Sequence, residues 1–94
     1  MSTQLTWRRV TEDLDYPEDI VYEAVTDDGY TLGSCYLEAG GPYAYARDAR
    51  GDGFDSVAIP GANIDEEIAA GKRVAERLLA ELRRDRERSQ PCSR

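Results

Sequence analysis

The sequence has no histidine, one lysine, one tryptophan and two cysteines among its 94 residues. The absence of histidine removes the commonest general base and the commonest metal ligand in proteins. Two cysteines are too few for a disulfide scaffold, and no apolar run approaches the roughly 18 residues that cross a membrane. Residues 1–10 contain Trp7 and two arginines but no apolar signal-peptide core. We therefore expect a non-enzymatic cytoplasmic protein without a metal, another cofactor or a membrane partner.

Acidic side chains outnumber basic ones by 19 to 12, which gives a net charge of -7. This balance argues against direct nucleic-acid binding, because a nucleic-acid binder must neutralise phosphates. Residues 1–70 hold 15 acids and 4 bases, whereas residues 71–94 hold 4 acids and 8 bases. The segment 10–46 has no base and contains nine acids, namely Glu12, Asp13, Asp15, Glu18, Asp19, Glu23, Asp27, Asp28 and Glu38.

Alternating apolar and polar residues predict strands over residues 5–10, 20–26, 30–38, 43–48 and 54–59. Most of the segments between them contain turn-forming residues: Asp27-Asp28-Gly29, Gly40-Gly41-Pro42 and residues 50–53. Separators this short favour antiparallel pairing of successive strands, which is a meander.

Residues 63–85 have the features of one amphipathic helix. Asn63 is a favoured N-cap, Glu66 occupies the capping-box position, and arginines concentrate near the other end. Spacings of three and four residues place an apolar stripe on Ile64, Ile68, Gly71, Ala75, Leu78, Leu79 and Leu82. Glycine costs about 1 kcal/mol relative to alanine inside a helix. We therefore expect the helix to approach a sheet closely at Gly71.

Strands followed by a helix predict the α+β class. The expected fold is an antiparallel four- to five-stranded meander followed by one C-terminal helix packed on one face. We expect a single domain over residues 1–88 and a disordered tail over residues 89–94. One helix leaves the second sheet face open, so that face should be polar or should pair with another surface.

The nine acids of segment 10–46 are candidate partner-binding residues. Nucleic-acid phosphates recur at about 3.4 Å per strand step, which is close to the rise of one residue along a β-strand. Carboxylates on a strand or loop could therefore imitate phosphates and bind a basic protein surface. The alternative is a solvated acidic surface that only aids solubility. Calcium binding by Asp15, Glu18 and Asp19 is disfavoured because the spacing of a calcium loop is absent.

Tyr22, Tyr36, Tyr43 and Tyr45 are candidate aromatic contact residues. If they share the open sheet face, they form a patch suited to a protein interface, because tyrosine buries a large area and keeps a hydroxyl for hydrogen bonding. This gives an alternative function, a structural or assembly module that forms a homodimer through a tyrosine-rich sheet face. The purely structural alternative is that these tyrosines are half-buried strand residues.

Catalysis has little support in the sequence. Cys35 and Cys92 are expected to be reduced thiols, and Cys35 has no histidine to activate it. Neighbouring acids should raise the pKa of the Cys35 thiol and make it a poor nucleophile.

Trp7 in a first short strand, the Tyr-Ala-Tyr-Ala strand at 43–46, a further strand and a helix opening with residues 65–76 resemble many small phage and prophage proteins. The resemblance covers residues 5–82 and rests on architecture and charge. Small acidic proteins of this origin include anti-CRISPR and anti-restriction inhibitors, several of which mimic nucleic acid. The resemblance implies a stoichiometric inhibitor in the host cytoplasm, docked on the nucleic-acid-binding surface of a host defence effector.

Overall fold

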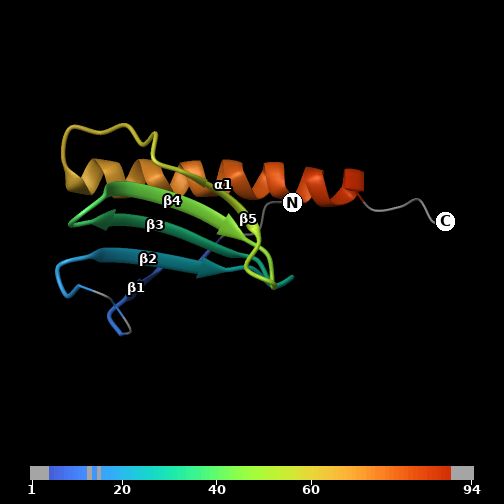
Figure 1. Cartoon of the computed structure of the whole chain (residues 1–94), viewed down its shortest axis with the longest axis horizontal. Coiled ribbons are helices and arrows are strands. Elements are labelled where there is room, and N and C mark those ends of the chain that lie inside the picture. The colour runs from blue at the N-terminus through green and yellow to red at the C-terminus, as the bar shows by residue number, and fades with distance from the viewer. Residues whose placement is uncertain (1–4, 13, 15, 90–94) are drawn as a thin grey trace.

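The computed structural model describes residues 5–12, 14 and 16–89 of the chain, and residues 90–94 lie outside the described part. Its elements are β1 (Arg8–Val10), β2 (Ile20–Val25), β3 (Thr31–Leu37), β4 (Gly41–Arg47), β5 (Gly53–Ser56) and α1 (Ile64–Ser89). Neighbouring strands pair antiparallel in chain order, and α1 lies along one face of the sheet (Figure 1). The predicted α+β meander with one C-terminal helix is confirmed. None of the described residues forms a helix long and apolar enough to cross a membrane.

The core lies between α1 and the last three strands, β3, β4 and β5. Fully buried Leu32, Ala44 and Ala46 supply the sheet side. The helix side consists of Ala70, Val74, Ala75, Leu78, Leu79 and Leu82. The small alanines of β4 let the helix lie close to the sheet, and the apolar stripe of α1 stays dry because it faces them.

Gly71 lies directly against β3 of the sheet, as its position on the apolar stripe predicts. The buried Ser34 hydroxyl of β3 donates a 2.7 Å hydrogen bond to the main-chain carbonyl of Ile68, one helical turn before Gly71. A Cβ atom at Gly71 would overlap the Ser34 hydroxyl. The predicted cap is also confirmed: the Asn63 side chain accepts a 2.9 Å hydrogen bond from the Glu66 N–H.

Element boundaries differ from prediction where apolar side chains reach the core without strand pairing. β1 begins at Arg8 rather than at residue 5, because Leu5 and Trp7 pack against the core from an irregular segment. β5 ends at Ser56 because the chain then crosses to the helix and buries Ile59. β4 begins at Gly41 and includes Pro42, which we had placed in the turn.

Two helix predictions were wrong. Ile64 is 40% exposed, so it is not part of the buried stripe, whereas Ala70 and Val74 are buried in its place. The helix also continues to Ser89, which we had assigned to the tail. The remaining tail residues, including Cys92, lie outside the described residues.

Candidate functional site

Acidic residues from three parts of the chain lie at one end of the sheet, where β2 begins, β3 ends and α1 begins (Figure 1). The pairing of Ile20 with Tyr36 brings the start of β2 beside the end of β3. The first turn of α1 follows at the same end, because Ile64 borders the groove that Ile20 also lines. We call this surface the acidic end; it consists of Glu18, Asp19, Glu38, Asp65, Glu66 and Glu67.

Three of these carboxylates are held close together. Asp19 is only 7% exposed, and it accepts a 2.9 Å hydrogen bond from the main-chain N–H of Glu38. The Glu18 side chain raises the pKa of the exposed Glu38 carboxyl, first by a hydrogen bond and then by repulsion between the two charges. Like charges this close oppose each other, and the Glu38–Asp19 hydrogen bond helps to hold them in place.

The acids in the first turn of α1 also stabilise the helix. Negative charge at a helix N-terminus complements the helix dipole. Glu66 has a further role, because its carboxylate accepts a 3.0 Å hydrogen bond from the main-chain N–H of Ala62. The sequence alone predicts only a capping role for Glu66, because the position of the helix start relative to β2 and β3 depends on tertiary structure.

The other predicted acids do not join the acidic end. Glu12 forms an ion pair of 3.4 Å with Arg8, and Glu23 accepts a 3.1 Å hydrogen bond from the Tyr45 hydroxyl. Asp27 is exposed at the opposite end of β2. Asp13 and Asp15 lie outside the described residues.

Asp28 also lies away from the acidic end, in the turn between β2 and β3. A hydrogen bond from Thr26 lowers the pKa of the Asp28 carboxyl, and Arg83 of α1 adds to the effect at 2.8 Å. Of the nine acids in segment 10–46, the described structure therefore brings together Glu18, Asp19 and Glu38.

The four candidate tyrosines do not form one patch, because they lie on opposite faces of the sheet. Tyr36 shares its face with Ser34, which contacts α1, and Tyr22 is on the same side beside the helix. Tyr43 and Tyr45 lie on the other face, with ring centroids 5.7 Å apart. Strand alternation separates the two pairs, since Tyr36 aligns with Pro42 and not with either tyrosine of β4.

The hydroxyls of Tyr43 and Tyr45 are engaged within the chain. The Tyr43 hydroxyl donates to Asp55 at 3.0 Å and accepts from Arg47 at 3.0 Å. The Tyr45 hydroxyl donates to Glu23, and its ring lies across Gly33, where a Cβ atom would overlap it. Tyr43 and Tyr45 are therefore part of a polar network that is bonded within the chain.

Cys35 lies on the same face as Tyr43 and is buried. Burial, followed by the charges of Glu23 and Asp19, raises the pKa of its thiol to about 11. The thiol is protonated at neutral pH, as the sequence led us to expect, and is a weak nucleophile there. The described residues include no group of three or more histidines, cysteines or acids arranged to hold a metal ion.

Comparisons with protein-family models, with curated proteins and with solved structures gave no match. A proposal about the function of this chain therefore rests on its own geometry and charge.

Proposed function

We propose that this chain is a non-enzymatic binding protein whose acidic end docks on a basic surface of a partner protein. The observation that supports the proposal is the close grouping of Glu18, Asp19 and Glu38, with the first turn of α1 at the same end. Such a grouping opposes folding through charge repulsion but steers a basic partner over long distances. Binding should therefore be fast and sensitive to salt.

The finer proposal concerns the class of partner. A basic protein surface that accepts clustered carboxylates is typical of nucleic-acid-binding proteins, because their sites are built for phosphates. The resemblance to small acidic phage proteins favours the same class, a host defence effector that the chain would inhibit by occupying its nucleic-acid site.

The homodimer alternative has weaker support. It would rest on Tyr43 and Tyr45, whose hydroxyls already bond to Asp55 and Glu23 in the same chain. Tyr22 and Tyr36 lie on the helix side and could not contribute to the same interface.

The test compares three immobilised baits: the unaltered chain, a Glu18→Lys/Glu38→Lys variant and a Glu76→Lys/Glu87→Lys variant. Glu76 and Glu87 are exposed on α1 away from the acidic end. Both variants replace two glutamates with two lysines, so they change the net charge equally. Circular dichroism first establishes that all three are folded. Each bait is then incubated with source-cell extract at low and at high salt.

We expect a protein that the unaltered chain and the Glu76/Glu87 variant retain at low salt and that the Glu18/Glu38 variant loses. High salt should release it from both binding baits. Duplex DNA should displace the captured protein if the acidic end occupies its nucleic-acid site. Equal capture by all three baits would contradict the proposal, and retention in the presence of DNA would contradict the finer one.

A further inference from the structure

One row of apolar side chains crosses the face of the sheet that α1 does not cover, which we call the open face. Tyr22 lines the groove beside α1, so strand alternation turns Val21 to the open face. The antiparallel registers of β1 to β4 align four residues in this row: Val10, Val21, Cys35 and Tyr43. Leu37 lies beside the row, two residues after Cys35 on β3. We call these five residues the apolar band.

The apolar band is not covered by another element of the described chain. Four of its members are half-buried, namely Val10, Val21, Leu37 and Tyr43. Among the described residues α1 is the one helix, and it lies along the other face (Figure 1). The open face of an antiparallel sheet usually carries polar side chains, because it faces water. An apolar row on that face therefore indicates a surface for a partner.

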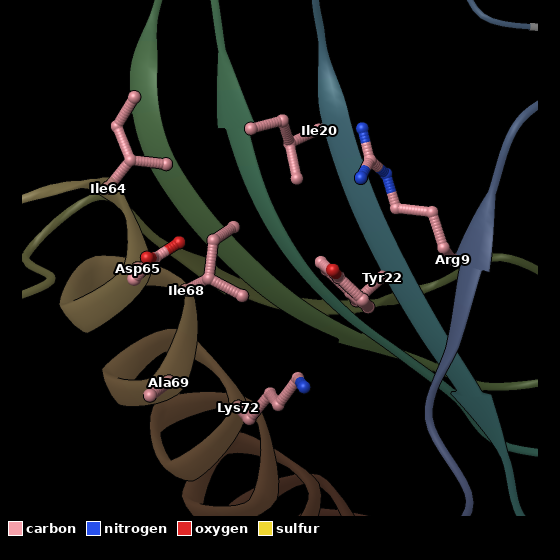
Figure 2. A pocket seen from close by; sticks show the side chains of 8 residues that line it. All are labelled: Arg9, Ile20, Tyr22, Ile64, Asp65, Ile68, Ala69 and Lys72. Carbon is pink, nitrogen blue, oxygen red and sulfur yellow. The ribbon is translucent and has the colours of Figure 1, made fainter.

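The helix side of β1 and β2 differs from the apolar band. A groove of about 260 Å³ separates this part of the sheet from α1. Figure 2 shows the Tyr22 ring between Arg9 and Lys72, whose charged groups are 5.6 Å and 4.5 Å from the ring centroid. Two cations of the same chain therefore already cover the aromatic surface on that side.

The two long sides of the apolar band carry different charges. The acidic end borders the band at Leu37, because the main-chain N–H of the next residue, Glu38, donates to Asp19. None of the ion pairs among the described residues involves Glu18, Asp19 or Glu38. On the other side the charged side chains are already bonded within the chain: Arg8, Glu23, Arg47 and Asp55. Uncompensated negative charge therefore lies along one side of the band.

The dimensions of the apolar band fit a short helix. Four strands spaced about 4.8 Å apart place Val10 and Tyr43 about 14 Å from each other. At a rise of about 1.5 Å per residue, a helix of about ten residues covers this length. Such a helix should lie across the strands, because a helix along them would bury charged Glu23 or Asp55 without new partners.

We propose that the apolar band receives the apolar face of a short, basic amphipathic helix of the partner protein. The helix would lie across β1 to β4, with its lysines or arginines on the side of the acidic end. A helix with one apolar face and one basic side complements both features of this surface. The inference rests on the proposed docking function and identifies the part of the partner that binds.

Two designed peptides of about 18 residues test the inference, because shorter helices are marginal in water. The amphipathic peptide has leucines on one helical face and lysines along one side of that face. The shuffled peptide has the same composition in an order that gives no apolar face, so it carries the same charge. Fluorescence anisotropy measures the binding of each peptide to the unaltered chain.

We expect the amphipathic peptide to bind with a Kd on the order of 10–100 µM, and the shuffled peptide to bind at least about tenfold more weakly. Equal binding of the two peptides would show attraction by charge alone and would overturn the inference. The amphipathic peptide should also bind more weakly to the Glu18→Lys/Glu38→Lys variant, because the charges beside the band are reversed. Unchanged binding to that variant would contradict the proposed orientation of the helix.

A matched pair of variants then locates the peptide, after circular dichroism establishes that both are folded. Val21→Thr puts a hydroxyl into the apolar band, whereas Val25→Thr makes the same change on the same strand and face, at a position that is 63% exposed outside the band. Both keep a β-branched side chain that suits a strand. Binding of the amphipathic peptide should weaken about fivefold or more in Val21→Thr and stay unchanged in Val25→Thr.

Two results would overturn the assignment of the band. Equal binding by Val21→Thr and Val25→Thr would place the peptide elsewhere. A dimer of the unaltered chain in sedimentation experiments, abolished in Val21→Thr, would show that a second copy occupies the band.

The same two variants, used as baits in source-cell extract, separate this inference from the docking function. The protein that the Glu18→Lys/Glu38→Lys bait loses should also be captured less by Val21→Thr and fully by Val25→Thr. Full capture by both valine variants would leave the docking function standing and overturn the helix. Equal capture by all baits would contradict the docking function itself, and with it the partner inferred here.

Discussion

The Ser34 hydroxyl and the main-chain carbonyl of Ile68 form a 2.7 Å hydrogen bond that joins β3 to α1. Ser34 is fully buried, so the bond satisfies a polar group that would otherwise destabilise the core. The same hydroxyl fills the space above Gly71. Where α1 crosses β3, the close approach therefore depends on this polar contact and on the missing side chain of Gly71.

Gly71→Ala should destabilise the protein even though alanine favours a helix by about 1 kcal/mol over glycine. The added methyl group overlaps the Ser34 hydroxyl, and overpacking of this kind costs about 1–3 kcal/mol. Ser34→Ala alone should cost about 1 kcal/mol through the lost hydrogen bond. The double variant should be more stable than Gly71→Ala, because alanine at position 34 removes the overlapping atom. Urea unfolding of all four proteins measures the coupling; additive changes would show that the two residues do not compete for space.

The close approach at Gly71 could be predicted because glycine on an apolar stripe is costly unless something occupies the space of its side chain. That Ser34 occupies this space could not, since the contact depends on where the helix crosses the sheet. The same reason explains the tyrosines: alternation along a strand puts Tyr43 and Tyr45 on one face, but it does not show which face of the sheet α1 covers. The acidic end depends on the Ile20–Tyr36 register, which places Glu38 beside Asp19. The groove depends on α1 lying over β3–β5, and no local pattern specifies that position.

Gly33→Ala should also destabilise the protein, by about 1–3 kcal/mol. The Tyr45 ring lies in the space that the new methyl group would need. Gly40→Ala is the matched control, because a Cβ atom there meets only Leu37 at the ordinary contact distance of 3.7 Å. Chemical denaturation should give a clear loss for the first variant and little change for the second. Similar losses in both would mean that general strand or turn effects, and not the Tyr45 ring, explain the result.

Cys35 should make stability fall at alkaline pH. An unfolded thiol ionises at about pH 8.5, whereas the folded thiol ionises at about 11. Between these values the unfolded chain loses its proton first, so the free energy of unfolding decreases as the pH rises. The full shift corresponds to about 3 kcal/mol. Cys35→Ser cannot titrate in this range and should show a smaller decrease between pH 8 and pH 11 in urea unfolding; identical slopes would refute this assignment.

Asp48 should connect stability at acid pH to the turn between β4 and β5. Burial acts to raise the pKa of its carboxyl, but hydrogen bonds from Arg86 and from the N–H groups of Asp52 and Arg50 lower it overall. A lowered carboxyl pKa stabilises the fold above the unfolded pKa of about 3.9 and loses that effect as the pH falls through the folded value. Asp48→Asn should therefore reduce Tm at pH 7 and have a smaller effect near pH 3. An equal loss at both pH values would exclude the charged interaction as its cause.

Glu18→Gln should lower the pKa of the Glu38 carboxyl towards its ordinary value. In the unaltered chain the raised pKa makes the folded state bind a proton more readily, so stability falls as the pH rises through that pKa. Removing the Glu18 charge relieves this loss, so Glu18→Gln should be at least as stable near neutral pH. Glu12→Gln is the control, because Glu12 pairs with Arg8.

NMR titration of the glutamate carboxyls measures the effect directly. An unchanged Glu38 pKa in Glu18→Gln would show that the two carboxyls do not interact and would remove the main support for the acidic end. A lowered pKa together with weaker capture of the partner would have the opposite meaning. One substitution would then raise stability and reduce binding, which is expected when like charges are held together for recognition at the expense of folding.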